Sequence, residues 1–275
     1  MDNRAFGPCL HCVIHFETFM MTVSRRLQAS LWHLGGSLTV AALAVALVWG
    51  VWYPMPYWYL AGGQDLLVLM LSVDLVLGPV LTAVVASPFK TARHLAMDVA
   101  LIVVLQLVGL GYGLYNVWQV RPVAMVAEYQ MLRVVIAADI LEEDWSKMPD
   151  GMGRWSVQRP VLMGVRPPRD QEERQQMTLQ VLKGKMPGSR PQYWQPYEKS
   201  REQVLGWASS VDKLPLNTDA ERQRLNAAIL ATGQPAPHLK ALPVLARDKG
   251  WVALLSARDA SVLGFVQVAG PEAPK

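Results

Sequence analysis

The chain has 275 residues, of which 52% are hydrophobic and only 17% are charged. Its net charge of +4 lies wholly in residues 121–275, which carry twenty-one basic and seventeen acidic side chains, whereas residues 1–120 carry five of each. An excess this small and dispersed excludes the clustered basic face that a nucleic-acid partner requires.

Three long stretches with almost no charge dominate the first 120 residues. Asp, Glu, Lys and Arg are absent from residues 34–64 and 99–120, and Asp74 is the one such residue within 66–89. A helix needs about 20 mostly apolar residues to cross the roughly 30 Å of hydrocarbon in a bilayer. The stretches therefore predict three transmembrane helices, at about residues 32–53, 66–87 and 95–118.

The chain before these helices is expected to be a cytoplasmic, disordered leader covering residues 1–26. Met21 is an alternative start of translation, since the residues that follow it are a more convincing beginning of the protein. Cys9 and Cys12 lie in this leader, but structural zinc usually takes four ligands from two paired knuckles and no second knuckle follows. We therefore expect neither a metal nor a cofactor.

Basic residues in the loops indicate the orientation of the spans. Arg25 and Arg26 precede the first span, Lys90 and Arg93 lie between the second and the third, and residues 54–65 contain no Lys or Arg. Because basic loops stay in the cytoplasm, the N-terminus and the second loop are predicted to be cytoplasmic. Three crossings then leave the chain after residue 120 on the far side of the membrane, which is the periplasm if this is a bacterial inner-membrane protein.

Two polar residues are predicted to meet inside the membrane. Asp74 lies about eight residues into the second span and Gln106 about twelve residues from the outer end of the third, an offset of about one helical turn. A hydrogen bond between them would fix the register of a three-helix bundle. The alternative is that Asp74 carries a proton or an ion, because an acid inside a membrane is a functional candidate.

Two glycine motifs are candidate faces for helix packing or for a partner. Gly78 and Pro79 interrupt the second span, where proline removes a backbone donor. Gly109 and Gly113 stand four residues apart in the third span, a spacing that lets another helix approach closely. That helix is either one of the other spans or a helix of a partner protein, and the pattern favours neither.

The remaining chain has the patterns of a small α+β domain. Strands are predicted within residues 122–137 and at 161–165, and helices at 169–182 and 218–232. The closing runs are typical of an antiparallel β-meander, at residues 242–247, 251–257 and 262–268. The fold class is thus an α+β membrane protein, with a three-helix module at 27–120 and a periplasmic domain at 121–275.

Catalytic side chains are scarce in that outer domain. Residues 121–275 contain one histidine, His238, and no cysteine. Neither a histidine-based metal site nor a cysteine nucleophile can be assembled from them. We therefore expect a binding or scaffolding domain and not an enzyme.

Two strings in the chain carry a family resemblance. They are Asp-Leu-Val-Leu-Gly-Pro at residues 74–79 and Arg-Pro-Val at 121–123, where Arg121 and Pro122 join the last span to the outer domain. In this order, and on this topology, the chain resembles the TfpX/TfpZ family of type IV pilin accessory proteins. The resemblance covers roughly residues 27–271, and the first twenty residues have no counterpart in it.

The resemblance implies an inner-membrane accessory factor that assists the stability or assembly of a cognate type IV major pilin, for pili used in twitching motility and adhesion. The expected partners are that pilin, the lipid bilayer and other pilus assembly proteins. We hypothesise that the face with Gly109 and Gly113 receives the apolar helix of the pilin. An alternative from another class is a small ion-coupled transporter or sensor that uses Asp74 with a periplasmic ligand-binding domain.

Overall fold

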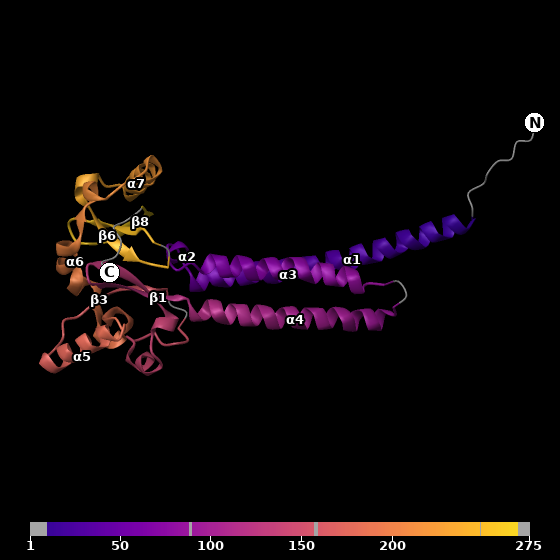
Figure 1. Ribbon diagram of the computed structural model, residues 1–275, viewed down its shortest axis with the longest axis horizontal. Coiled ribbons are helices and arrows are strands. Elements are labelled where there is room, and N and C mark those ends of the chain that lie inside the picture. The colour runs from indigo at the N-terminus through magenta and orange to yellow at the C-terminus, as the bar shows by residue number, and fades with distance from the viewer. Residues whose placement is uncertain (1–9, 88–89, 157–158, 248, 269–275) are drawn as a thin grey trace, which may run out of the picture. The chain divides into compact units, whose positions relative to one another are not determined.

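The computed structural model describes residues 10–87, 90–156, 159–247 and 249–268. The chain divides into two compact units, of which one comprises Met1–Ala46 and Asp65–Asn116, and the other Leu47–Gln64 and Val117–Lys275. The first unit holds most of three long helices and the second holds the β-sheet (Figure 1). We call them the helical unit and the sheet unit.

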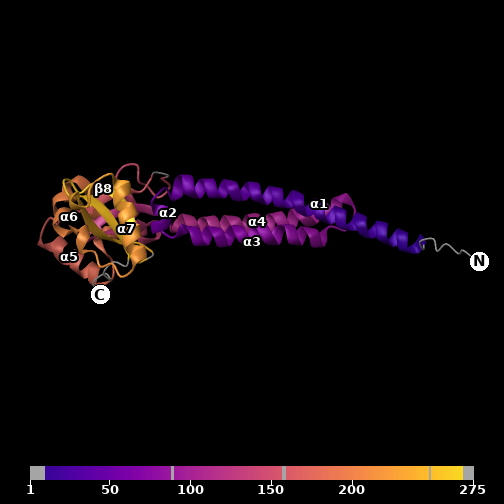
Figure 2. The ribbon, with the colours of Figure 1, turned by 90° about the horizontal axis from the view of Figure 1, so that it is seen from above.

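Three long apolar helices make up the helical unit. They are α1 (Leu10–Leu47), α3 (Gly63–Val85) and α4 (Ala92–Gln119), and they run side by side in both ribbon views (Figure 1, Figure 2). A π-helical turn at Val48–Trp52 continues α1. By length and composition, segments of all three helices can cross a membrane, which confirms the prediction of three apolar helices: Arg26–Trp52, Leu67–Val85 and Ala92–Gln119.

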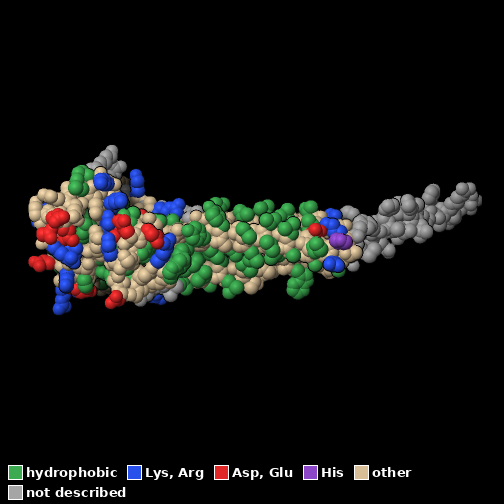
Figure 3. All heavy atoms as spheres, turned by 90° about the horizontal axis from the view of Figure 1, so that it is seen from below, with side chains coloured by type: hydrophobic (Ala, Val, Ile, Leu, Met, Phe, Trp, Pro, Cys, Tyr) green, Lys and Arg blue, Asp and Glu red, His purple; other side chains and the backbone are tan. Residues whose placement is uncertain are grey.

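The outer surface of these helices is apolar. Figure 3 shows hydrophobic side chains along them, and the exposed ones include Leu69, Val76, Leu101 and Val108. A helix in water keeps polar residues on its outer face, whereas a helix that is hydrophobic all round is typical of a membrane span. The surface of the helical unit therefore fits a lipid environment.

Helix α1 begins at Leu10, although a disordered leader is expected through residue 26. No glycine or proline occurs between Pro8 and Gly35, so this segment contains neither of the two residues that most strongly disfavour a helix interior. The helix therefore extends more than twenty residues before the start of the span predicted near residue 32. Residues 1–9, with Cys9 among them, lie outside the described residues.

One mixed sheet forms the centre of the sheet unit. Its order is β4-β3-β1-β2-β6-β7-β8, and β5 pairs with β6. The strands are β1 (Pro122–Glu128), β2 (Met131–Ile136), β3 (Val161–Val165), β4 (Trp194–Pro196), β5 (Ser209–Ser210), β6 (Leu239–Leu245), β7 (Trp251–Ser256) and β8 (Val262–Gln267). The pairs β1–β3 and β2–β6 are parallel and the other neighbours are antiparallel, so the predicted meander is confirmed as β6-β7-β8.

Four shorter helices accompany the sheet. They are α2 (Tyr57–Leu60), α5 (Gln171–Leu182), α6 (Arg201–Trp207) and α7 (Asp219–Thr232). Helix α7 begins at a capping box, in which the Thr218 hydroxyl accepts from the Glu221 amide, and it ends at Gly233 with φ of 67°. Both helices predicted for this domain, α5 and α7, are present.

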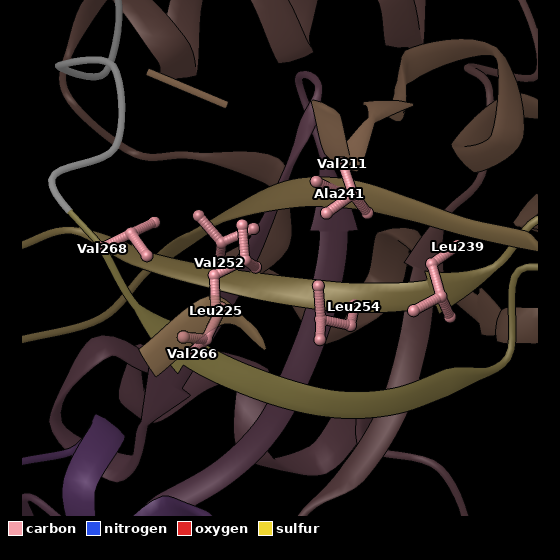
Figure 4. Close-up of a cluster of buried hydrophobic side chains, with 8 residues drawn as sticks. All are labelled: Val211, Leu225, Leu239, Ala241, Val252, Leu254, Val266 and Val268. Atoms are coloured by element: carbon pink, nitrogen blue, oxygen red, sulfur yellow. The ribbon is translucent and has the colours of Figure 1, made fainter. Parts of the chain in front are cut away.

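The core of the sheet unit consists of two clusters of buried hydrophobic residues, one at each end of the strand order. Leu225 of α7 belongs to the same buried cluster as Val252, Leu254 and Val266 of β7 and β8 (Figure 4). A second cluster is built on β1 and β2 and contains Ala124, Val126, Val135, Ile140, Met152 and Trp194. Alternation of apolar residues along the strands produces these buried faces.

Candidate functional site

A chain of hydrogen bonds links the three helices of the helical unit, and His33 of α1 is at its centre. The Nδ1 atom of His33 lies 2.7 Å from the Thr82 hydroxyl of α3, and its Nε2 atom lies 2.7 Å from the amide oxygen of Gln106 in α4. Gln106 in turn donates from Nε2 to the main-chain oxygen of Asp74 at 2.9 Å. We call these four residues the His33 network.

The partners of His33 indicate which ring nitrogen carries the proton. The Gln106 oxygen can only accept, so Nε2 of His33 is the donor in that contact. Nδ1 can then accept a hydrogen bond from the buried hydroxyl of Thr82. A single tautomer of the imidazole therefore satisfies both contacts of the ring.

Gly78 creates the space that the His33 network occupies. A Cβ atom at this position would lie 2.7 Å from Nε2 of His33 and closer still to the Gln106 amide nitrogen. The next residue, Pro79, accepts a hydrogen bond from the Ser30 hydroxyl of α1 at 2.9 Å through its main-chain oxygen. The Gly78-Pro79 motif therefore serves close packing within the bundle.

The predicted contact between Asp74 and Gln106 forms in a different way from the one expected. Gln106 donates to the main-chain oxygen of Asp74 and not to its carboxyl, while the amide oxygen of Gln106 contacts His33. The carboxyl of Asp74 has no hydrogen bond or ion pair with any residue that the structure describes. A half-buried carboxyl thus stays unpaired within a predicted span.

The two glycines of α4 have different surroundings. A Cβ atom on Gly113 would collide with Met70 of α3, so Gly113 serves packing between two spans of this chain. A Cβ atom on Gly109 would meet nothing within 4 Å. Of the two glycines, Gly113 therefore packs against another span of this chain, and Gly109 is the one that remains open to a helix of a partner protein.

A groove of about 590 Å³ opens between α1 and α4 in the helical unit. Asp74 of α3 lines it, together with His33 and Gln106. The rest of the lining is mostly apolar or small and includes Ala29, Gly36 and Val40 of α1, and Ala92, Ala96, Val103 and Leu110 of α4. We call this feature the α1–α4 groove.

In the sheet unit, Arg121 organises the junction that precedes β1. Its guanidinium lies 3.4 Å from the centre of the Trp118 ring and donates to the Trp118 main-chain oxygen at 2.9 Å. Burial lowers the pKa of Arg121 to about 10, and the guanidinium remains charged at neutral pH. Pro122 is the first residue of β1, where its missing N–H is tolerated.

Aromatic residues from two distant segments meet at the same junction. Trp52 contacts Trp118 with ring centres 5.1 Å apart, and the Tyr53 hydroxyl donates to the main-chain oxygen of Val117 at 3.0 Å. The segment after Trp52 is also tied to the start of the loop after β6, since Arg247 donates from its main chain to Leu60 and from its side chain to Gly62, at 3.1 and 3.0 Å. These contacts incorporate Leu47–Gln64 into the sheet unit.

Sequence reasoning missed His33 as a member of the site, because the first span was predicted to begin at about residue 32, which placed His33 at the very end of that span. The available signal was the segment Arg26–Trp52, which is apolar enough to begin a span seven residues before His33. Within the described residues, no group of three or more His, Cys, Asp or Glu side chains could hold a metal ion. The site is thus a hydrogen-bonded network beside an apolar groove.

Comparisons with known proteins agree on one family. A sequence model of fimbrial assembly protein FimB matches residues 21–62. The fimbrial assembly protein of Dichelobacter nodosus serogroup I is 31% identical over 188 residues, which cover 68% of this chain and 73% of that protein. The serogroup E1 protein is 32% identical over 198 residues, covering 68% and 77%.

A third relative, the fimbrial assembly protein of D. nodosus serogroups C1 and C2, is 40% identical over 108 residues, covering 39% of this chain and 82% of that protein. No solved structure matches the chain. The matches are to fimbrial assembly proteins, and the more specific resemblance to the TfpX/TfpZ group remains a prediction.

Proposed function

Since this chain belongs to the FimB family of fimbrial assembly proteins, we propose that it is an accessory factor that binds a cognate type IV major pilin and assists its stability or assembly. The relatives support a role in pilus assembly. Family membership is the observation that carries the proposal. The role requires binding and no catalytic step, in keeping with a site composed of hydrogen bonds and apolar surface.

The proposed location is the bacterial inner membrane, with the N-terminus in the cytoplasm and residues 121–275 in the periplasm. Arg26 donates to the main-chain oxygen of Ala86 at 3.0 Å, next to the loop that carries Lys90 and Arg93. The basic residues of the N-terminal segment and of the second loop therefore gather at one end of the helical unit. This arrangement supports the orientation expected from basic loops.

In this proposal the two units have separate tasks. A pilin awaiting assembly is held in the membrane by one apolar helix and has its globular head outside. The helical unit offers apolar surface to that helix, and the sheet unit offers the surface of a folded domain to the head. Contacts of both kinds would keep the pilin in a form ready for assembly.

The test uses the host bacterium with the gene for this chain deleted. We expect fewer surface pili and a lower level of the cognate pilin, both restored by the wild-type gene. A strain that instead makes an unrelated major pilin is the control, because an accessory factor for one pilin should leave the other unaffected. Unchanged pili and unchanged pilin levels in the deletion strain would contradict the proposal.

The unpaired carboxyl of Asp74, which lines the same groove as His33, favours one second candidate, an ion-coupled transporter or sensor. The deep histidine supplies another ionisable group to a proton path, which the sequence alone did not indicate. Purified protein in liposomes distinguishes the two functions. A transporter moves protons or ions and loses that flux in Asp74→Asn, whereas an accessory factor shows no flux in either protein.

A further inference from the structure

We propose that the α1–α4 groove is the binding site for a single membrane-spanning helix of the pilin, and that this helix carries a hydrogen-bond donor that meets the Asp74 carboxyl. The inference rests on the proposed function and names the site at which it operates. It moves the contact from the face with Gly109 and Gly113 to a different face of α4.

The dimensions of the groove suit a helix. Along α4 the groove runs from Ala92 to Leu110, a stretch of 19 residues whose ends lie about 27 Å apart at 1.5 Å per residue. This length is close to the roughly 30 Å of hydrocarbon that a spanning helix must cross. An occupant that fills the groove from end to end is therefore as long as a transmembrane helix.

The walls of the groove allow the backbone of that helix to come close. Small residues line both sides, with Ala29 and Gly36 on α1 and Ala92 and Ala96 on α4. A Cβ atom on Gly36 would meet nothing within 4 Å, so the space beside it is open. Helices in membranes associate through such small residues, because packing contacts replace the hydrophobic effect there.

The polar group in the groove argues against lipid as the occupant. Asp74 lines the groove and its carboxyl has no partner among the described residues. An acyl chain cannot donate a hydrogen bond, so lipid would leave this carboxyl unsatisfied in the hydrocarbon at high cost. A helix with a donor at the same depth would satisfy it.

A second copy of this chain is the competing occupant, because Trp32, next to His33 on α1, is exposed and carries an indole N–H. The groove has the length of one helix, and in a fimbrial assembly protein the pilin is the partner that has a single spanning helix. We therefore assign the groove to the pilin, and the crosslinking experiment distinguishes the pilin from a second copy.

The His33 network fixes two side chains that line the groove before the partner arrives. His33 and Gln106 line the groove and are held by Thr82 and by the main chain of Asp74. Their hydrogen bonds join α1 directly to α4, and each of these helices to α3, at this level. They act as positioning residues, and the unpaired Asp74 carboxyl is the group left to recognise the partner.

Site-specific photo-crosslinking tests the site. A photoreactive amino acid is placed at Val103, which lines the groove, or at the adjacent Val104, which is exposed and does not line it. Membranes that contain the cognate pilin are irradiated, and adducts are identified by mass and with antibody to the pilin. We expect a pilin adduct from position 103 and none from position 104.

Two substitution pairs sharpen the result. Gly36→Leu fills the groove, whereas Gly35→Leu is a matched control, since Gly35 does not line the groove and a Cβ atom on it would meet nothing within 4 Å. We expect Gly36→Leu to reduce the adduct by about tenfold or more at normal protein abundance, and Gly35→Leu to leave it unchanged. Asp74→Leu should abolish the adduct, and Asp74→Asn should retain part of it because the amide oxygen still accepts.

Other outcomes overturn the inference. Position 103 could yield adducts only with lipid or with a second copy of this chain, or positions 103 and 104 could react equally with pilin. Capture of pilin solely from the sheet unit, with a photoreactive residue at the exposed Tyr129, would refute the groove and leave the proposed function intact. Absence of any pilin adduct together with unchanged piliation in the deletion strain would refute both.

Discussion

Replacing Gly78 with alanine tests the close packing on which the His33 network depends. The new methyl group would lie 2.7 Å from Nε2 of His33, well inside van der Waals contact. Either His33 and Gln106 move and three hydrogen bonds of about 0.6 kcal/mol each are lost, or the overlap persists at a typical cost of 1–3 kcal/mol. Both routes lower the free energy of unfolding by about 2 kcal/mol.

Gly35→Ala is the matched control for the gain in helix propensity, because a methyl group at Gly35 meets nothing within 4 Å. Unfolding of the two variants in mixed micelles of mild detergent and SDS should differ by about 2 kcal/mol, or about thirtyfold in the folding equilibrium. In a background with His33→Ala and Gln106→Ala the difference should shrink, since the atoms nearest the new methyl are gone. Equal stability of the two single variants would refute the reasoning.

Three further predictions concern the sheet unit and the topology. Asp144 is buried beside Arg190 and Lys147, and although burial alone would raise its pKa, hydrogen bonds from these two residues hold it below the ordinary value of 3.8. The ionised Asp144 therefore contributes fully to the free energy of unfolding above that value, and the contribution is lost as the pH falls below it. In chemical unfolding at neutral pH, Asp144→Ala should cost about 3–5 kcal/mol. Asp144→Asn should weaken the dependence of the free energy of unfolding on acidic pH. Thr218→Ala removes the cap of α7 and should cost about 1 kcal/mol, whereas Thr218→Ser should cost little. Alkaline phosphatase, which is active only outside the cytoplasm, should be active when fused after Lys275 and inactive when fused after Lys90; the reverse pattern would contradict the orientation.

The sequence was most informative where structure depends on local pattern. Charge-free stretches located the three helices, alternation located the meander, and the spacing of Thr218 and Glu221 located the start of α7. Each of these signals depends on residues close together in the chain. The parallel pairing of β2 with β6 was beyond such reasoning, because the two strands are more than one hundred residues apart.

The candidate site shows the same division. Depth along a helix follows from residue spacing, so Asp74 and Gln106 were expected to meet. The rotation of each helix about its axis does not follow from depth, and this rotation decides which group of Asp74 is contacted. It also brings His33 to Gln106 and turns Gly113 toward Met70. Which side chains face each other depends on how the helices pack together. The sequence of a single helix does not determine this packing.

The attachment of Arg247 to Leu60 and Gly62 has a consequence for the order in which the protein matures. The ribosome completes the connection between α1 and α3 long before it makes Arg247, since Arg247, the main-chain donor to Leu60, comes 187 positions later in the chain. During synthesis this connection must wait without its final hydrogen bonds until β6 and the residues after it have emerged. A shortened chain that stops before Arg247 would therefore leave an early segment unfinished, far from the point of truncation.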